Sequence, residues 1–288
     1  MKIIIINATI NWVYRLYEEY IISIKDFIKN HYNNVFIEIK YIDSSLFTCN
    51  NLNEIDFKIY DKIFYSGNIE ILNLIIYKSN NNYKNIYFIN IEQMSNESYY
   101  TMTRNVNNNV NIIDYSEENI PYFKNIYNNV YLIPPYFKYN EDKKDKTIDV
   151  LSILNNEYRK TILNNLVFKE DLNILFLNNC YGSIRDEHFA NSKIYINIHC
   201  SENHKTMEMI RLINLIFNKV IIISQKSIYS DILFMKKYII ICNENDEINT
   251  YTNEILNNYK YYYDKIYGNF NSSEYYNYIK LNVDKIFS

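Results

Sequence analysis

The segment 192–224 constrains the fold of this chain more than any other part of its sequence. It opens with Ile194–His199, an almost wholly apolar run of the kind that a strand buried on both faces shows. The polar residues Cys200–His204 follow, Lys205–Phe217 carries apolar residues at helical spacing, and Val220–Ile223 is a β-branched run. A strand, a loop, a helix and a strand in this order predict a βαβ unit with parallel strands.

This unit also predicts where a ligand binds. The loop after the first strand and the first helical turns face the crevice outside the carboxyl ends of a parallel sheet, where α/β proteins hold their ligands. We therefore expect these polar side chains nearest a ligand: Glu202, His204, Lys205 and Glu208. A zinc site is not expected, because His199 and His204 have no third ligand at a suitable spacing.

The same alternation of strand and helix patterns runs through the rest of the chain. Short apolar or β-branched runs predict strands at 2–6, 35–42, 62–65, 85–91, 110–114, 130–133, 147–153, 172–177 and 238–241. Apolar residues at helical spacing predict helices at 14–30, 69–77, 157–168, 185–190, 246–263 and 273–287, with a short helix from Ser116. This alternation favours the α/β class, with parallel sheets covered on both faces.

The strongest candidate for a domain boundary lies between 134 and 146. Pro134 and Pro135 break regular structure, and the charged run Glu141–Lys146 is the least hydrophobic segment. We therefore expect two domains, at 1–138 and 139–288, with the C-terminal helix in the second. Since both halves show the strand–helix alternation, both are expected to be Rossmann-like.

Charge, composition and motifs disfavour several functions. The chain has 288 residues, 48% of them hydrophobic, and its formal net charge of −3 offers no electrostatic case for nucleic acid or an anionic membrane. No apolar stretch approaches the roughly 18 residues of a membrane span, and the run Met1–Ile6 is too short for the core of a signal peptide. We expect a cytoplasmic protein, in the host cytoplasm if the chain is viral. The absence of G-x-G-x-x-G and of a P-loop disfavours dehydrogenases and P-loop NTPases.

Several motifs together resemble one enzyme family. Ser192–His199, Glu202, Glu208-Met209-Ile210-Arg211 and Val220–Ser224 are similar, in this order, to the second-domain signature of group 1 GT-B glycosyltransferases of bacteria and giant viruses. Weaker matches are Asn90–Gln93, Asp114–Ser116 with Asn119, Tyr131–Tyr136, and Gly182 with Arg185 and Asp186. The resemblance covers roughly residues 85–242.

The resemblance implies two Rossmann-like domains that face each other across a cleft, and a donor site in the second. Glu208 would accept hydrogen bonds from the ribose of a nucleotide, near the positive end of a helix. Arg159 and Lys160 would face the diphosphate, together with Lys205 and the backbone N–H groups at the helix start. The donor site would be completed by Ser201, His204 and Arg211.

Three residues are candidates for catalysis. Glu92, at a strand end of the first domain, would be a general base for an acceptor hydroxyl, or alternatively would hold the interdomain turn. His199 and Glu202 would lie near the transferred sugar, although Glu202 and Glu208 stand closer together than the paired glutamates of the family. For Glu208 and Arg211 the alternative is a surface ion pair between residues three apart on a helix.

The leading interpretation is a glycosyltransferase that moves a sugar from a nucleotide-sugar donor to a hydroxyl of a carbohydrate, a lipid or a protein. The second domain would hold the donor and the first the acceptor. No Asp-x-Asp motif occurs, so we expect neither a metal ion nor a cofactor. Two alternatives stay open, namely a catalytically degenerate GT-B module that binds a nucleotide or glycan, and a nucleotide-sugar epimerase.

Overall fold

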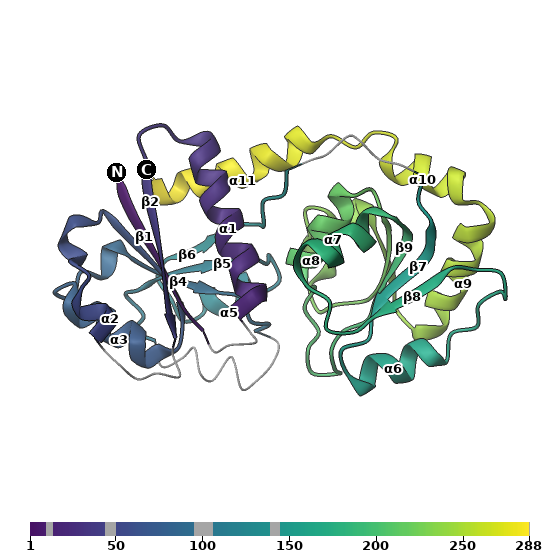
Figure 1. Cartoon of the computed structure of the whole chain (residues 1–288), viewed down its shortest axis with the longest axis horizontal. Helices are drawn as coiled ribbons and strands as arrows, with labels where there is room; N and C mark the ends of the chain where they lie inside the picture. The colour runs from purple at the N-terminus through teal and green to yellow at the C-terminus, as the bar shows by residue number, and fades with distance from the viewer. Residues whose placement is uncertain (10–13, 44–49, 95–105, 139–144, 288) are drawn as a thin grey trace. The chain divides into compact units, whose positions relative to one another are not determined.

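The computed structural model describes residues 1–9, 14–43, 50–94, 106–138 and 145–287. Contacts divide the chain into two compact units. Unit 1 comprises Met1–Tyr136 together with Tyr276–Ser288, and unit 2 comprises Phe137–Tyr275. Each unit is a sheet with helices packed around it (Figure 1).

Unit 1 is built on a six-stranded parallel sheet with the strand order β2-β1-β3-β4-β5-β6. Its strands are β1 Lys2–Thr9, β2 Phe36–Asp43, β3 Lys62–Gly67, β4 Ile86–Asn90, β5 Asn111–Asp114 and β6 Val130–Leu132. Its helices include α1 Tyr14–His31, α2 Asn50–Asn53, α3 Ile69–Lys78 and α5 Ile120–Lys124, with short 3-10 turns at Phe57–Ile59 and Tyr83–Asn85.

The isoleucine run of β1 explains why this strand lies inside the sheet. Ile3–Ile6 are all fully buried, and since successive side chains point to opposite faces, the strand needs cover on both. The crossovers from β1 to β2 and from β3 to β4 run in opposite directions along the sheet. Right-handed crossovers therefore put α1 and α3 on opposite faces, and Leu72 and Ile75 of α3 join the core cluster of Ile4 and Ile6.

β3 ends at a glycine that the fold requires. Gly67 has a φ of +147°, a backbone conformation that residues with a side chain rarely adopt. A Cβ atom at this position would lie 2.2 Å from the carbonyl oxygen of Ala8 on β1. Glycine thus lets the two strands approach each other at their carboxyl ends.

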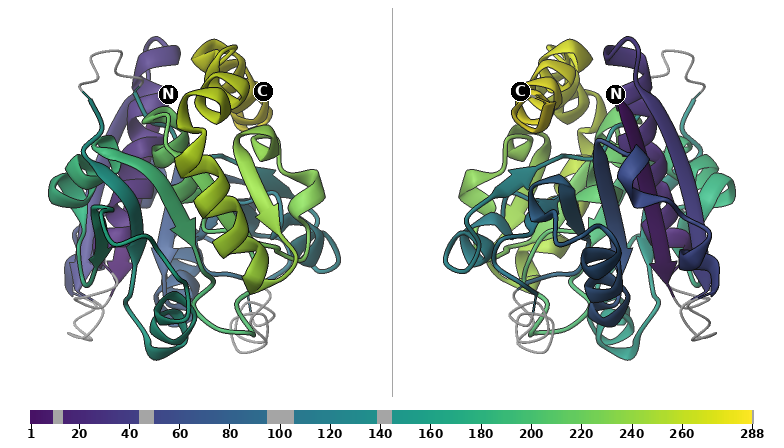
Figure 2. Two further views of the ribbon diagram at one scale, coloured as in Figure 1. Left: turned by 90° about the vertical axis from the view of Figure 1, so that its right-hand side faces the viewer. Right: turned by 90° about the vertical axis from the view of Figure 1, so that its left-hand side faces the viewer.

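Unit 2 is built on a five-stranded parallel sheet with the strand order β11-β10-β9-β7-β8. Its strands are β7 Ile148–Ile153, β8 Ile174–Leu177, β9 Ser192–Asn197, β10 Ile221–Gln225 and β11 Ile239–Cys242. Its helices include α6 Glu157–Asn164, α7 Gly182–Ala190, α8 Met209–Phe217, α9 Asn245–Asn257 and α10 Tyr259–Tyr267, with 3-10 turns at Ser230–Ile232 and Lys236–Tyr238. Helix α9 packs against β10 and β11 (Figure 2).

The predicted α/β class, with two Rossmann-like units on parallel sheets, is confirmed. The central βαβ unit is β9, α8 and β10, and β9 lies between β7 and β10 in the middle of its sheet. Among the helices of the described residues, none combines the length and the apolar character that crossing a bilayer requires.

The central helix begins later than its pattern predicts. We expected it from Lys205, whereas α8 starts at Met209 with Glu208 as the N-cap residue. Thr206 and Met207 are fully buried in non-helical backbone, and Ser224 Oγ of β10 lies 3.3 Å from Met207 Sδ. Met207 thus satisfies the helical spacing in sequence but packs as part of the loop.

The C-terminal helix corrects the predicted domain division. Helix α11, Ser272–Phe287, was assigned with the rest of 139–288 to the second domain, but from Tyr276 onward it belongs to unit 1. Tyr32 of α1 donates a hydrogen bond of 2.6 Å to Asp284, and the rings of Tyr136 and Tyr276 lie 5.4 Å apart. The apolar stripe of α11 packs here, with Ile279, Val283 and Ile286 buried.

Candidate functional site

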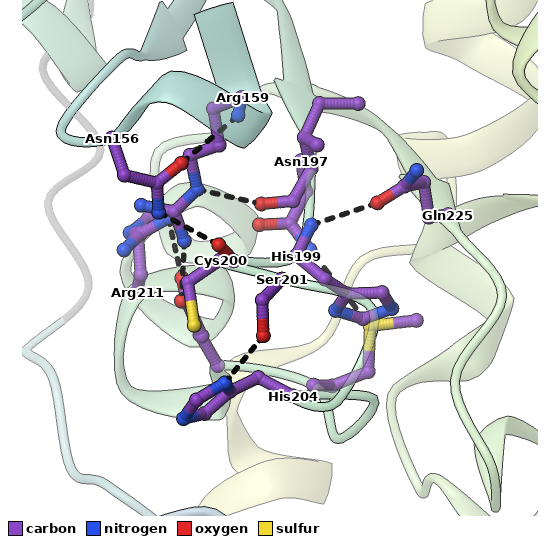
Figure 3. A network of polar contacts seen from close by, with 12 residues as sticks. Asn156, Arg159, Asn197, His199, Cys200, Ser201, His204, Arg211 and Gln225 are labelled. Atoms are coloured by element: carbon purple, nitrogen blue, oxygen red, sulfur yellow. Dashed lines mark hydrogen bonds and ion pairs between the residues drawn. The ribbon is translucent and has the colours of Figure 1, made fainter. Parts of the chain in front are cut away.

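The carboxyl end of β9 continues into a segment that neighbouring elements hold on both sides. The carbonyl oxygen of Ile198 accepts from Arg159 Nε at 2.9 Å, and that of Cys200 accepts from Asn156 Nδ2 at 2.8 Å (Figure 3). The backbone N–H of His199 donates to Gln225 Oε1 at 2.8 Å. Side chains from α6 and β10 therefore fix the backbone that carries the predicted site.

Helix α6 supplies two of these contacts because of its N-cap. Asn156 precedes the helix, and its Oδ1 accepts from the backbone N–H of Arg159 at 2.9 Å. Asparagine is among the preferred N-cap residues, since its side chain satisfies an N–H group of the first turn. The cap and the guanidinium thus reach the β9–α8 loop from a single helical turn.

Three charged side chains meet beside this segment. Arg159 Nη2 lies 2.6 Å from Glu208 Oε1, and Arg211 Nη1 lies 2.5 Å from Glu208 Oε2. Arg211 also donates to the hydroxyl of Tyr195 at 2.9 Å. The exposed fractions of the side chains are 5% for Arg159, 15% for Arg211 and 19% for Glu208, so this is not the surface ion pair of the alternative interpretation. Two guanidinium groups around one carboxylate leave a net positive charge in a mostly buried place.

Burial and charge act in opposite directions on Glu208. Burial raises the pKa of its carboxyl, but the adjacent Arg159 and Arg211 outweigh burial and hold the pKa below its ordinary value. Burial raises the pKa of the nearby Cys200 thiol to about 11. At neutral pH the site therefore contains a carboxylate and a protonated thiol.

His199 is held as a neutral ring. Its Nε2 lies 3.2 Å from the carbonyl oxygen of Lys226, and because a carbonyl only accepts, the ring proton sits on Nε2. Burial lowers the pKa of His199, which keeps the ring uncharged at neutral pH. Its Nδ1 is buried and has no hydrogen-bond partner in the described structure.

Ser201 and His204 form a contact within the loop itself. Ser201 Oγ lies 2.7 Å from His204 Nδ1, and the backbone N–H of Asn203 lies 3.3 Å from the same Oγ. The structure thus brings together six of the predicted residues around the carboxyl end of β9, namely Arg159, His199, Ser201, His204, Glu208 and Arg211 (Figure 3).

Other predicted residues of unit 2 lie apart from this group. Glu202 and Lys205 are exposed in the loop, and the carbonyl of Lys205 accepts from the backbone N–H of Ile228 at 3.0 Å. Lys160 forms a 2.6 Å ion pair with the exposed Glu157 on α6. These side chains are therefore more exposed than the charged group around Glu208.

Glu92 belongs to unit 1 and follows β4. Its carbonyl oxygen accepts from the side chains of Asn90 and Asn119, each at 2.9 Å. Both amides also donate to the fully buried Asp114, Asn90 at 2.6 Å and Asn119 at 3.1 Å. This network fixes the backbone at Glu92, and its acidic member has a pKa that burial raises to about 7 against the opposing effect of these hydrogen bonds.

Sequence reasoning missed the residues that support the site. Asn156 has a signature that points to it, because an asparagine directly before a helical pattern predicts an N-cap. Gln225, Asn197 and Thr206 have none, since their importance depends on which strands become neighbours. Among the described residues there is no group of three His, Cys, Asp or Glu side chains that is placed to hold a metal ion.

Comparison with protein families and curated proteins gives relatives of unknown function. No protein-family model matches the chain. The uncharacterized protein R358 of Acanthamoeba polyphaga mimivirus is 30% identical over 200 residues, which cover 66% of this chain and 68% of R358. The uncharacterized mimivirus protein L140 is 29% identical over 185 residues, and the match covers 60% of each chain.

Solved structures of one phage enzyme are similar in fold to this chain. T4 phage β-glucosyltransferase (BGT) in complex with UDP and Mn²⁺ has a TM-score of 0.51 and 14% identity, over 89% of this chain and 90% of that one. A point mutant of BGT in complex with UDP-glucose has a TM-score of 0.53 and 16% identity, over 88% and 89% of the two chains. At such identity the likeness establishes the fold and nothing further.

Similarity in sequence goes further for the mimivirus relative, which matches over more than two thirds of its own length. The chain belongs to the same protein family as the mimivirus protein R358.

Proposed function

We propose that the chain is a glycosyltransferase that moves a sugar from a nucleotide-sugar donor to a hydroxyl acceptor. Unit 2 holds the donor at the carboxyl end of β9, and unit 1 supplies the acceptor side. The observation that carries the proposal is the buried group of Arg159, Glu208 and Arg211, whose charges sum to a net positive value.

This group suits a diphosphate. A guanidinium has five N–H groups. In Arg159, the Nε proton is donated to the carbonyl of Ile198, and one Nη2 proton is donated to Glu208. Its remaining N–H groups have no protein partner among the described residues, so they are available to phosphate oxygens. In a place with little water, fixed cations stabilise the negative charge that develops on a leaving nucleoside diphosphate. Glu208 retains lone pairs for a ribose hydroxyl, since a carboxylate accepts about four hydrogen bonds.

The finer assignments are part of the same proposal. Cations of the chain take the place of a metal ion, so transfer requires neither a divalent ion nor a cofactor. The acceptor is a carbohydrate, lipid or protein hydroxyl rather than nucleic acid, consistent with the net charge of −3. Glu92, on a backbone fixed by Asn90 and Asn119, is the general base. We place the reaction in the cytoplasm, of the host cell if the chain is viral.

The alternatives from the sequence predict different outcomes. A degenerate GT-B module binds the nucleotide or glycan, but it does not cleave a nucleotide-sugar and so produces no free nucleotide. An epimerase converts the nucleotide-sugar to an isomer without any acceptor. Structures of T4 phage BGT contain UDP with Mn²⁺ and UDP-glucose, which makes uridine nucleotides and manganese the first conditions to examine.

The test is a thermal-unfolding screen against UDP-, GDP-, dTDP- and CMP-sugars, with and without Mg²⁺ or Mn²⁺. A ligand that binds only the folded state adds about 2.7 kcal/mol at a hundredfold excess over Kd, which raises the melting temperature by a few degrees. Arg159→Lys should reduce the shift because it loses the planar guanidinium. Lys193→Gln should leave it unchanged, since it removes an ion pair with Asp149 near the amino end of β9.

Two outcomes would contradict the proposal. No shift with any nucleotide-sugar would exclude the donor site. A shift that appears only with a divalent ion would exclude the metal-independent form. Release of nucleotide in the presence of glycan, lipid, protein or duplex DNA acceptors then separates a transferase from a binding module and identifies the class of acceptor.

A further inference from the structure

Buried polar atoms without partners are concentrated in one short segment of unit 2. Among the described residues of this unit, four of the five such atoms belong to Asn197, His199, Thr206 and Glu208. Glu208 Oε2 still faces Arg211 as an ion pair, so the uncompensated atoms are Asn197 Oδ1, His199 Nδ1 and Thr206 Oγ1. Most buried polar atoms in folded proteins have a hydrogen-bond partner, so these three atoms mark a place that a bound molecule can complete.

His199 is the most sharply defined of the three. The carbonyl oxygen of Lys226 fixes the ring proton on Nε2, and the backbone N–H of His199 is fixed by Gln225 Oε1. Nδ1 therefore presents a lone pair and no proton. A lone pair attracts a hydrogen-bond donor and repels an anion, so its partner is a hydroxyl or an N–H group and not a phosphate oxygen.

The two sides of the segment serve different chemistry. The carbonyl of Ile198 points toward α6, where it accepts a hydrogen bond from Arg159 of the charged group. The N–H of His199 points toward β10, where it donates to Gln225. A trans peptide directs these two groups in opposite directions. Asn197 and His199 are two residues apart, so in extended backbone their side chains lie on the same face. The ring of His199 is held on the β10 side by the carbonyl of Lys226, whereas Arg159 reaches Ile198 from the α6 side.

We infer that His199 Nδ1 accepts a hydrogen bond from a hydroxyl group of the sugar that is transferred. The inference rests on the proposed donor site and names a role for His199 in recognising the sugar, without proton transfer. Nδ1 is shielded from solvent in the ligand-free chain, so the inference requires the side chains around the ring to shift when the sugar binds.

The direct test is ¹⁵N NMR of histidine rings in the wild-type protein with UDP-glucose and with UDP. The chain has four histidines, so the spectrum contains few ring resonances. The resonances of His199 are assigned as those that disappear in His199→Gln. Acceptance of a hydrogen bond moves the Nδ1 resonance upfield, and we expect this with UDP-glucose and not with UDP. A resonance that stays in place with UDP-glucose while the nucleotide-sugar binds would overturn the inference.

Two substitutions separate the ring nitrogens. Gln carries its amide nitrogen the same number of bonds from Cβ as imidazole Nε2, so His199→Gln keeps a donor for Lys226 and loses the acceptor. Asn carries Oδ1 as far from Cβ as imidazole Nδ1, so His199→Asn keeps the acceptor and loses the contact to Lys226. We expect His199→Gln to bind UDP-glucose at least tenfold more weakly with UDP affinity unchanged, and His199→Asn to keep its affinity for UDP-glucose with a lower melting temperature.

Failure of this inference differs from failure of the proposed function. If the wild-type chain binds UDP-glucose and His199→Gln binds it equally well, the role of Nδ1 is wrong and the donor site stands. If the wild-type chain binds none of the UDP-, GDP-, dTDP- and CMP-sugars of the thermal-unfolding screen, the donor site itself is excluded, and the inference with it. A ring resonance that moves equally with UDP would assign the contact to the nucleotide and overturn the assignment to the transferred sugar.

Discussion

Arg159 and Glu208 are 49 residues apart in sequence, yet their side chains form an ion pair of 2.6 Å at the carboxyl end of β9. The same guanidinium donates to the carbonyl of Ile198, so one side chain ties helix α6 to both the strand end and the N-cap of α8. A second cation, Arg211, occupies the other carboxylate oxygen. Both guanidinium groups thus share Glu208 as their acidic partner. Replacement of Glu208 therefore tests whether this charged group stabilises unit 2.

Replacement of Glu208 by Gln should destabilise unit 2 strongly. It leaves two mostly buried guanidinium groups without this counter-charge, and loss of one partner of a buried ion pair costs roughly 3–5 kcal/mol. Urea unfolding measures the change. The control is Lys193→Gln, which breaks a more exposed ion pair with Asp149 in the same unit and should cost no more than about 1 kcal/mol. Equal losses for the two variants would contradict a structural role of the charged group.

Asn156 should affect both helix stability and ligand binding, in separable ways. Asn156→Ala removes the N-cap of α6 and the donor to Cys200, and loss of a cap costs about 0.5–2 kcal/mol. Asn156→Asp keeps a capping oxygen but has no N–H to offer the Cys200 carbonyl. We therefore expect Asn156→Asp to unfold close to wild type in a thermal melt but to bind nucleotide-sugar more weakly. Wild-type affinity in both variants would show that the contact to Cys200 does not shape the site.

Asp114 should make the stability of unit 1 depend on pH. Burial raises its pKa from 3.8 to about 7 in the folded chain, whereas the unfolded chain keeps the ordinary value. Between these pH values the unfolded carboxyl has lost its proton and the folded one has kept it. The free energy of unfolding therefore falls as the pH rises from about 4 to about 7, by up to about 1.4 kcal/mol per pH unit, and then levels off.

The measurement for Asp114 is a ¹³C NMR titration of its carboxyl, combined with unfolding at several pH values. In Asp114→Asn the corresponding slope of stability against pH should disappear, because the side chain no longer titrates. A carboxyl that titrates near its ordinary pKa in the folded protein would show that the hydrogen bonds from Asn90, Asn119 and Ser116 outweigh burial.

The contact between α1 and α11 should contribute measurably to unit 1. Tyr32→Phe removes a half-buried hydrogen bond to Asp284 and should lower the free energy of unfolding by about 1 kcal/mol. Tyr262→Phe is the matched control, because its hydrogen bond to Glu254 is exposed and its loss should leave stability unchanged. If the two variants have the same free energy of unfolding in urea, the contact between Tyr32 and Asp284 contributes little to the stability of unit 1.

The strands, helices and charged candidates followed from local patterns. The isoleucine run of β1 and the alternation of strands and helices predicted the parallel sheets, because a strand buried on both faces needs apolar side chains at every position. The spacing of Glu208 and Arg211 allowed an ion pair, which the structure contains, but the pair is mostly buried and not the surface pair of the alternative interpretation. The predicted start of α8 was wrong because Met207 is apolar in either conformation, and only its packing beside Ser224 decides that it lies in a loop.

Hydrophobic periodicity was enough to predict which face of a helix or strand is buried, because buried residues recur at the spacing of that element. Which buried faces meet was settled by the folded chain. The stripe of Ile279, Val283 and Ile286 required a partner, but it packs in unit 1 although its chain neighbours before Tyr276 belong to unit 2. In the same way, the resemblance made Glu208 and Arg159 candidates for one donor site, and only the fold shows that the two side chains form an ion pair. The physical reason is that periodicity encodes the face that an element buries, whereas its partner depends on contacts between residues far apart in the chain.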